Sequence, residues 1–310
     1  MQAERVAVVG AGAVGCYFGG MLARAGVPVT LIGRAFHVEA IQRDGLFLER
    51  SDFQGYVRSD ADVHIEAVRK AAIVLLCVKT VDTESAAVAL APHVGDGAIL
   101  VSLQNGVDNV ERIRRATGID AIPAVVYVAV EMTGPGRVTH SGRGDLIIGE
   151  LLSSTRRPGR LEHVEALFTL AGIPCRVSDN IAAELWTKLV INCAYNAISA
   201  LGRARYGLIK DNPLTRDVMR QVIAEVVAVA TAAGVFLPDA EHLTTAALKL
   251  GQAMAEATSS TAQDLARGKP TEIDSLNGYV ARRGAELGVP APVNSTLHAL
   301  VKLLESTMIR

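Results

Sequence analysis

The stretch RVAVVGAGAVGCYFGGMLARA, residues 5–25, decides the fold that this sequence predicts. Its apolar, β-branched start is typical of a buried strand, and it opens directly into Gly10-x-Gly12-x-x-Gly15, which a helix of small residues follows. Gly10 permits a tight turn, Gly12 lets the backbone approach a pyrophosphate, and Gly15 lets the helix pack closely on the strand. The helix N-terminus adds amide donors for an anion. We therefore expect a Rossmann-like dinucleotide-binding domain, with a glycine-rich turn that holds no ligand as the alternative.

The end of the next expected strand, residues 28–32, indicates which dinucleotide binds. An NAD-specific site would place an acidic residue there for the ribose 2′-hydroxyl, but this chain has Gly33-Arg34. A guanidinium suits a 2′-phosphate through paired, charge-assisted hydrogen bonds. Arg34 therefore favours NADPH, unless it is an ordinary solvated loop charge.

Two further strand ends are expected at the same crevice, because the carboxyl ends of parallel strands face the ligand in doubly wound sheets. Lys79 follows an apolar strand over 72–78, and Asn105 follows another over 98–103. Lys79 could simply close its strand, and Asn105-Gly106 could be only a turn. The remaining elements expected in this half are helices over 37–43, 84–90, 107–115 and 161–171, and strands over 45–49, 54–58, 122–130, 137–140, 145–148 and 174–177, with Gly-Pro-Gly and Ser-Gly-Arg-Gly turns joining the strands after 122 into antiparallel hairpins.

The pattern becomes wholly helical after residue 178. We expect helices over 179–203, 212–233, 240–257, 272–287 and 294–306. This change marks a domain boundary. The predicted organisation is an α/β Rossmann-type NADP-binding domain over 1–178 and an all-α substrate and catalytic domain over 179–310.

The helix predicted over 179–203 carries a polar stripe on an apolar background. Lys188, Asn192 and Asn196 stand four residues apart and so share one face. Buried polar groups need a partner, so we interpret the stripe as the lining of a substrate cleft. The alternative is a lysine that reaches to the surface beside two satisfied core amides. Downstream, we interpret Glu272 as facing Lys188 and Ser260 as giving a hydroxyl to the substrate, although Thr271 or a neighbour could simply cap the next helix.

Composition excludes several other classes of function. Half of the 310 residues are hydrophobic and the formal net charge is −1, so no basic field is available to hold a nucleic acid or an anionic membrane. Histidines are dispersed without metal-ligand spacing, so we expect no metal. The four cysteines are isolated, no signal peptide is evident, and the apolar runs are too short to span a membrane, which favours a cytoplasmic protein with reduced thiols. The helical half offers surface for a possible homodimer.

Together, these motifs resemble those of the ketopantoate reductase family over essentially the full chain. The matching features are Gly10, Gly12 and Gly15, Lys79, Asn105-Gly106, Trp186-x-Lys188-x-x-x-Asn192-x-x-x-Asn196, and Ser259-Ser260 followed by Thr271-Glu272-Ile273-Asp274. The resemblance implies a second domain like the C-terminal domain of 6-phosphogluconate dehydrogenase. It also implies an NADP-dependent oxidoreductase that reduces 2-dehydropantoate to (R)-pantoate in pantothenate and coenzyme A biosynthesis.

The resemblance also assigns roles to residues. Lys188 would be the general acid, and Glu272 would hydrogen-bond with Lys188 or the substrate and border the cofactor. Asn192, Asn196 and Ser260 would hold the substrate, a small 2-oxo acid, and Asn105 would border both ligands. Asp264 matches another recurrent position without a firm role.

The chain departs from the family pattern near the substrate end. The loop after the Lys188 helix offers Gly202, Arg203, Arg205 and Tyr206 where an asparagine is frequent, and residues 256–258 lack an Asn-Arg pair. A hydrogen-bonding pocket discriminates strongly through such groups, so a different 2-oxo acid is one alternative. Two others are a β-hydroxyacid or 6-phosphogluconate-type dehydrogenase and a non-catalytic NADPH-sensing or scaffolding protein.

Overall fold

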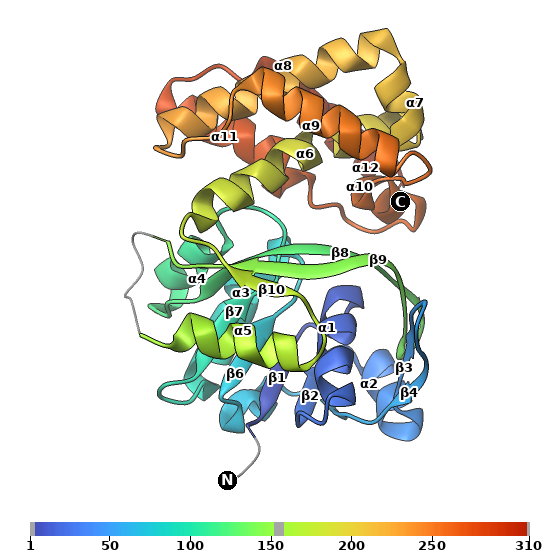
Figure 1. Cartoon of the computed structure of the whole chain (residues 1–310), viewed down its shortest axis with the longest axis vertical. Coiled ribbons are helices and arrows are strands. Elements are labelled where there is room, and N and C mark those ends of the chain that lie inside the picture. The colour runs from blue at the N-terminus through green and yellow to red at the C-terminus, as the bar shows by residue number, and fades with distance from the viewer. Residues whose placement is uncertain (1–3, 152–157, 309–310) are drawn as a thin grey trace. The chain divides into compact units, whose positions relative to one another are not determined.

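The computed structural model describes residues 4–151 and 158–308 and divides into two compact units, Met1–Ile181 and Ala182–Arg310 (Figure 1). The sequence placed the boundary between residues 178 and 179, at the last loop before the long helix. The first unit contains the sheet and the second is helical, so the fold class is an α/β Rossmann-like domain followed by an all-α domain.

Four short apolar strands form the parallel centre of the first unit. They are β1 (Val6–Val9), β2 (Val29–Ile32), β6 (Ile73–Leu76) and β7 (Ile99–Ser102), and they neighbour one another in the order β7-β6-β1-β2. All of these pairings are parallel. The edge strand β5 (Asp60–Asp62), which the sequence did not predict, pairs with β2.

Both faces of this parallel sheet are covered, which explains why its strands are uniformly apolar. Along β1, Val6 and Val8 pack with α1 (Ala13–Arg24) and α5 (Arg160–Leu170). Ala7 and Val9 pack on the opposite side with α3 (Thr83–Leu90) and α4 (Asn109–Thr117). Successive side chains of a strand point to opposite faces, so a strand between two helical layers has no polar side.

A long antiparallel pair extends the sheet, and here one prediction was wrong. Strand β8 (Ile122–Gly134) turns through Pro135-Gly136 into β9 (Arg137–Ile148), which continues unbroken through the predicted Ser-Gly-Arg-Gly turn (Figure 1). The register shifts there instead, and Arg143 and Gly144 have φ of 53° and 152°. The glycines therefore serve an irregularity inside one strand, a use of glycine that composition does not distinguish from a turn.

The other strands complete the sheet around β9. Strand β3 (Leu46–Glu49) pairs with β9 in parallel and with β4 (Gln54–Val57) in antiparallel fashion, and β10 (Cys175–Val177) pairs with the far end of β9. The sheet order is β4-β3-β9-β8-β7-β6-β1-β2-β5, with β10 beside β9. Helix α2 (Ala35–Asp44) follows β2, and a 3-10 helix, η1 (Ile65–Lys70), precedes β6.

The second unit is built on the long helix α6 (Ile181–Gly202). It continues as α7 (Tyr206–Asp211), α8 (Pro213–Ala232), α9 (Ala240–Ala253), α10 (Ser260–Ala266), η4 (Ile273–Ser275), α11 (Asn277–Leu287) and α12 (Pro292–Met308). Helices α7 and α10 were not predicted, α9 ends earlier than expected, and the helix predicted over 272–287 is interrupted. The interruption lies at Leu276, whose φ of −109° and ψ of −108° are not helical.

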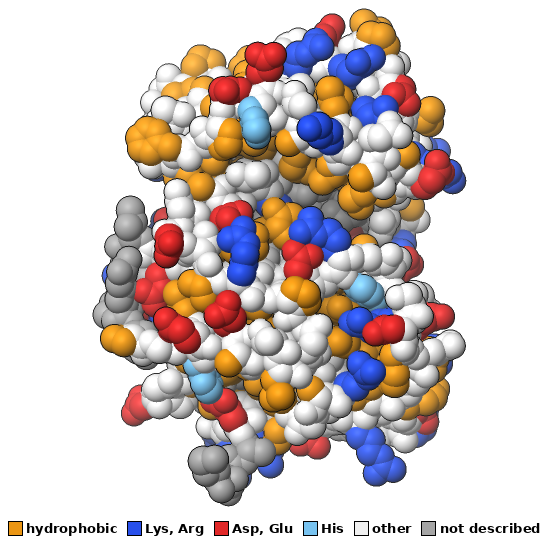
Figure 2. Space-filling view, viewed as in Figure 1, with side chains coloured by type: hydrophobic (Ala, Val, Ile, Leu, Met, Phe, Trp, Pro, Cys, Tyr) orange, Lys and Arg blue, Asp and Glu red, His pale blue; other side chains and the backbone are white. Residues whose placement is uncertain are grey.

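On the face drawn in Figure 2, basic and acidic side chains are interspersed, with apolar side chains between them. Within residues 4–151 and 158–308, no helix has the length and apolar character needed to cross a membrane. In the same ranges, no group of three or more His, Cys, Asp and Glu side chains is arranged to hold a metal ion.

Candidate active site

The carboxyl ends of β2, β1, β6 and β7 meet at one edge of the parallel sheet, because these strands are neighbours that run in the same direction. Each strand leads into a segment that carries predicted cofactor residues. The glycine turn of Gly10, Gly12 and Gly15 follows β1, Arg34 follows β2, Lys79 follows β6, and Asn105 follows β7. The fold thus brings the sequence-predicted residues of the first unit to the same edge.

The three glycines of the turn have different physical roles. Gly10 has a φ of +107°, and a Cβ there would lie 2.7 Å from the backbone carbon of Cys77. A Cβ on Gly15 would lie 2.1 Å from the carbonyl oxygen of Gly10, so this close approach of helix and strand tolerates only glycine. A Cβ on Gly12 would meet no atom within 4 Å. Packing therefore requires two of the glycines, while the third borders open space at the N-terminus of α1.

A hydrogen-bond network behind Asn105 fixes its backbone. The Asn105 carbonyl accepts hydrogen bonds from Thr80 Oγ1 at 2.9 Å and from Asn109 Nδ2 at 2.7 Å. Gln104, buried beside it, donates to the Val78 carbonyl at 3.1 Å. The segments after β6 and β7 are thereby tied to each other. No sequence pattern predicted this network, because it joins two segments through contacts across 25 and 26 positions of the chain.

Arg34 is exposed immediately before the first residue of α2 and makes no ion pair or side-chain hydrogen bond with the described residues. It is therefore available to an external anion. The structure adds an acidic residue that the sequence did not associate with this edge, since β5 ends at Asp62 beside β2. The Asp62 carboxylate accepts the backbone N–H of His64 at 2.9 Å and so faces its own loop. Lys79 is also exposed, on the segment between β6 and α3.

Helix α6 presents the predicted polar stripe of the second unit. Lys188 and Asn192 are partly exposed, and Asn196 is buried, with 3% of its surface exposed. The neighbouring Leu189, Val190 and Cys193 are all buried. The helix therefore keeps an apolar face in the core and leaves Lys188 and Asn192 at a polar edge, whereas Asn196 lies in the interior.

The segments that carry Ser260 and Glu272 are hydrogen-bonded to this same helix. Ser259 Oγ donates to the Asn196 carbonyl at 3.1 Å and accepts the N–H of Ala262, which makes Ser259 the buried N-cap of α10. Asn277 Nδ2 donates to the Cys193 carbonyl at 3.2 Å. Both segments therefore lie along α6 near the stripe. Of the two adjacent serines, Ser260 is exposed, and the sequence could not distinguish it from the structural Ser259.

Glu272 is partly exposed at the start of η4, which has no side-chain cap. The alternative role considered for Thr271 receives only weak support, because the N–H of Ile273 lies 3.4 Å from Thr271 Oγ1. Thr271 itself is buried, with 6% of its surface exposed. The segment around Glu272 is held instead by charged residues of α12, described below.

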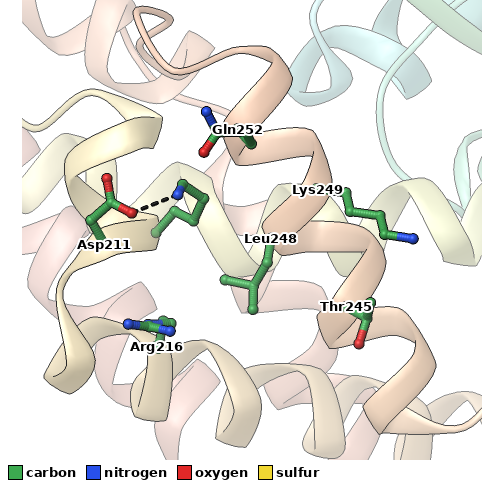
Figure 3. Close-up of a pocket in the computed structure, with 7 residues that line it drawn as sticks. Asp211, Arg216, Thr245, Leu248, Lys249 and Gln252 are labelled. Carbon is green, nitrogen blue, oxygen red and sulfur yellow. Dashed lines mark hydrogen bonds and ion pairs between the residues drawn. The ribbon is translucent and has the colours of Figure 1, made fainter.

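A separate pocket of about 310 Å³ lies among α7, α8 and α9 (Figure 3). Lys210 Nζ donates to Asp211 Oδ1 at 2.5 Å. Figure 3 shows Lys249 extending away from Asp211 and Arg216. Residues from 210–216 and 245–252 line this pocket, and they include none of the predicted site residues. The pocket is therefore distinct from the residues that the sequence identified.

Comparison with known proteins decides the family. The family model described as ketopantoate reductase PanE/ApbA matches residues 6–153, and its C-terminal counterpart matches residues 180–305. The chain belongs to the ketopantoate reductase family. It is 34% identical over 302 residues to the 2-dehydropantoate 2-reductase of Pyrococcus horikoshii, covering 97% of this chain and 98% of that protein. It is 33% identical over 304 residues to that of Halobacterium salinarum, covering 97% and 99%.

Solved structures of this family have the same fold. A ketopantoate reductase of the PanE/ApbA family from Ralstonia eutropha is 47% identical, with a TM-score of 0.92 over 99% of this chain and 100% of that one. The 2-dehydropantoate 2-reductase of Geobacter metallireducens is 30% identical, with a TM-score of 0.89 over 96% and 99%. A D-mandelate dehydrogenase in complex with NADH and anilino(oxo)acetate has a TM-score of 0.91 at 22% identity, over 98% and 99%, which is a likeness of fold alone.

Proposed function

We propose that this protein reduces 2-dehydropantoate to (R)-pantoate with NADPH, and that Lys188 is the general acid. The observation that carries this proposal is the full-length match to 2-dehydropantoate 2-reductases, together with the polar stripe of Lys188, Asn192 and Asn196 on α6. Membership of the family supports the reaction, and the stripe supplies the proton donor and the hydrogen-bond donors that the reaction needs.

The residues at the sheet edge fit a nicotinamide dinucleotide. Gly12 leaves the backbone accessible, and no side chain caps the first turn of α1, so the backbone N–H groups of that turn can bind an anion such as a pyrophosphate. Asn105 borders this site on a backbone fixed by Thr80 and Asn109. Lys79 adds positive charge at the neighbouring strand end. A nicotinamide bound here would supply the hydride, and the protein supplies binding and orientation.

The ammonium group of Lys188 would stabilise the transition state of ketone reduction. Negative charge builds on the substrate oxygen as the ketone is reduced, and an ammonium stabilises that charge before it gives up its proton. We assign Asn192, Asn196 and Ser260 to the substrate's hydroxyl and carboxylate groups, which amides and hydroxyls can hold in one orientation. We assign Glu272 to a hydrogen bond that orients Lys188 or the substrate, at the border of the cofactor site.

Replacing Lys188 tests the assignment of the general acid. Lys188→Ala should lower kcat by a factor of about 10² to 10⁴ at saturating NADPH, because a positioned proton donor contributes this much. Lys188→Arg keeps the positive charge but holds its proton too tightly to donate it, so it should recover substrate affinity without recovering kcat. Turnover is followed by NADPH absorbance.

Lys249→Ala is the matched control, since Lys249 is an exposed lysine of the same unit outside the predicted site. It should behave as the parent. A Lys188→Ala enzyme within about tenfold of the parent kcat would exclude Lys188 as the general acid.

The preference for NADPH rests on Arg34. Arg34→Ala should raise the KM for NADPH about tenfold or more and leave the KM for NADH nearly unchanged, because a charge-assisted contact to the 2′-phosphate is worth about 1.5 kcal/mol or more. Arg43→Ala removes an exposed charge from the other end of α2 and serves as the control. An unchanged ratio of the two KM values in Arg34→Ala would contradict the assignment.

One observation favours a second candidate, reduction of a different 2-oxo acid. Tyr206 lies in the segment after α6 where the family pattern frequently has an asparagine. Its ring stacks on that of Tyr195, with ring centroids 4.3 Å apart, and its hydroxyl lies 3.5 Å from Asn196 Oδ1. It therefore borders a predicted substrate residue. Comparison of kcat/KM for 2-dehydropantoate and a panel of 2-oxo acids decides between the two, and a better substrate in that panel would favour the second.

A further inference from the structure

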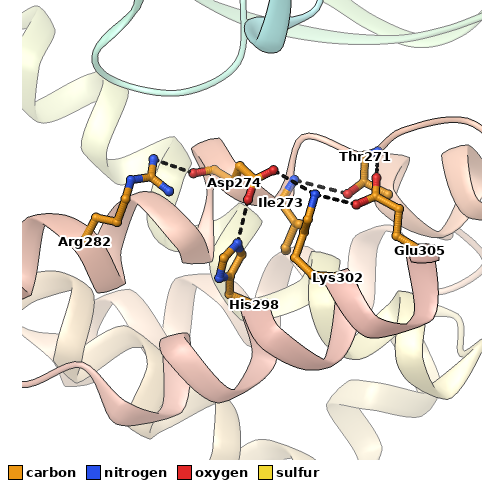
Figure 4. A network of polar contacts seen from close by, with 7 residues as sticks. All are labelled: Thr271, Ile273, Asp274, Arg282, His298, Lys302 and Glu305. Atoms are coloured by element: carbon orange, nitrogen blue, oxygen red, sulfur yellow. Dashed lines mark hydrogen bonds and ion pairs between the residues drawn. The ribbon is translucent and has the colours of Figure 1, made fainter.

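Charged side chains of α12 form a continuous network with η4 (Figure 4). His298 Nε2 lies 2.6 Å from Asp274 Oδ1, and Lys302 Nζ donates to Asp274 Oδ2 at 3.0 Å. Lys302 also pairs with Glu305 Oε2 at 2.6 Å. The spacing of four and then three residues places His298, Lys302 and Glu305 on one face of α12.

This network holds the backbone on both sides of Glu272. Before it, the N–H of Thr271 donates to Glu305 Oε1 at 2.6 Å. After it, Arg282 Nη2 donates to the Asp274 carbonyl at 2.9 Å, while the Asp274 side chain is held from α12. Figure 4 shows Thr271 and Asp274 held by α11 and α12. Glu272 therefore lies, along the chain, between two residues that other helices hold in place.

The segment needs such support, because its own secondary structure is slight. Helix η4 is a single 3-10 turn of three residues, and no side chain caps it. The anchors, by contrast, are firmly placed. Glu305 has 6% of its surface exposed, and a Cβ on Gly278 would lie 2.8 Å from the His298 ring, so that ring is packed directly against the α11 backbone.

The charge states suit this role at neutral pH. Partial burial raises the pKa of Asp274, but hydrogen bonds from His298 and Lys302 outweigh it and hold the pKa below its usual value. For Lys302, burial lowers the pKa, and the hydrogen bonds to Glu305 and Asp274 outweigh it and raise the pKa. Both side chains are about half exposed, and pairs of this kind add little stability. Their main effect is therefore on geometry.

We infer that Asp274, Lys302 and Glu305 are positioning residues that fix the segment presenting Glu272 to the reaction. The inference rests on the proposed function of Glu272. A displacement of about 1 Å at a reacting group costs up to about 100-fold in rate, so a carboxylate on a short irregular turn depends on its supporting residues.

A double-mutant cycle tests the kinetic part. Asp274→Asn and Lys302→Met should each lower kcat about tenfold in the parent, whereas adding either to Glu272→Gln should cost less than about twofold more, because residues that act through one group are not additive. Thermal midpoints confirm that each variant is folded. Equal losses in the parent and the Glu272→Gln background would overturn the inference.

Hydrogen exchange tests the same segment without turnover. Amides of 271–276 should exchange about tenfold faster in Lys302→Met than in the parent, while those of α6 should not change. Glu286→Gln removes a carboxylate from the pair between Arg283 and Glu286 on α11, outside the network, and should leave both readouts at the parent values.

The two readouts separate failure of the inference from failure of the proposed function. If the parent protein does not turn over 2-dehydropantoate or any other 2-oxo acid, the proposed function is refuted. The rate of amide hydrogen exchange in residues 271–276 would then still test whether α12 anchors this segment. Unchanged exchange in this segment of Lys302→Met would overturn the inference, whatever the activity.

Discussion

At the scale of single residues, the glycines of the turn after β1 are required for two different reasons, close packing and access for a ligand. Gly15 is needed because α1 approaches the strand within the space of a methyl group, whereas Gly12 faces open space. Gly12 has an extended backbone, with φ of −88° and ψ of −168°, which any residue can adopt. The fold therefore does not require glycine at position 12, and we propose that the cofactor does.

This difference predicts opposite outcomes for two similar substitutions. Gly15→Ala should destabilise the protein by about 1 to 3 kcal/mol, because its Cβ meets backbone that must shift. Gly12→Ala should change the free energy of unfolding by less than about 0.5 kcal/mol and yet weaken NADPH binding about tenfold or more. Denaturant unfolding and NADPH fluorescence titration measure the two effects. A Gly12→Ala protein with parental NADPH affinity would contradict the role assigned to Gly12.

The residues that could be predicted from the sequence are those whose positions follow from local spacing. Gly10, Gly12 and Gly15 follow from a fixed motif between strand and helix, and Lys188 and Asn192 follow from helical periodicity. The residues that support them could not be found in this way. Glu305 reaches Thr271 across 34 positions, and the Asn105 carbonyl is held from Thr80, so no spacing in the chain encodes either contact.

At the scale of elements, the segments with a strong apolar pattern were predictable and the shortest helices were not. The parallel strands and α6 have continuous apolar patterns that fix their type. Helices α7 and α10 have six and seven residues. A helix this short gains little from propensity, and tertiary contacts such as the hydrogen bond from Ser259 Oγ to the Asn196 carbonyl decide whether it forms.

The interrupted helix before α11 illustrates the same limit. The pattern over 272–287 suits one continuous helix, but Asn277 Nδ2 bonds to the Cys193 carbonyl and lies 2.9 Å from Asn294 Oδ1. These contacts bring the start of α11 against α6 and α12. Their partners are 84 and 17 positions away along the chain, so the local apolar pattern carries no information about these contacts.

At the scale of the whole molecule, Cys16 and Cys193 are buried, and Cys77 and Cys175 are partly buried against the core of the first unit. Burial raises the pKa of Cys16 to about 12, and burial together with Glu165 raises the pKa of Cys175 to about 12. Burial also raises the pKa of Cys77 and Cys193. The pKa of an ordinary thiol is about 8.5, so the raised pKa values favour the protonated form of these thiols at pH 8.

The four thiols should therefore react slowly with iodoacetamide at pH 8 in the native protein and rapidly in guanidinium chloride, because only the thiolate is nucleophilic. Mass spectrometry at timed intervals measures the labelling. A Ser51→Cys variant, which places a thiol at an exposed loop position, should gain one fast label without denaturant. Rapid labelling of the native parent would show that its thiols are accessible, against this expectation.

The anchoring of Glu272 from α12 also bears on how the protein is made. Chains fold from their N-terminal parts onward as they leave the ribosome. The glycine turn and the Lys188 helix are translated long before Lys302 and Glu305, which hold the segment around Glu272. A nascent or prematurely terminated chain that stops short of α12 would carry both earlier motifs, but the segment that carries the Glu272 carboxylate would not be held in place. Catalytic competence would then arrive only once α12 has been synthesised.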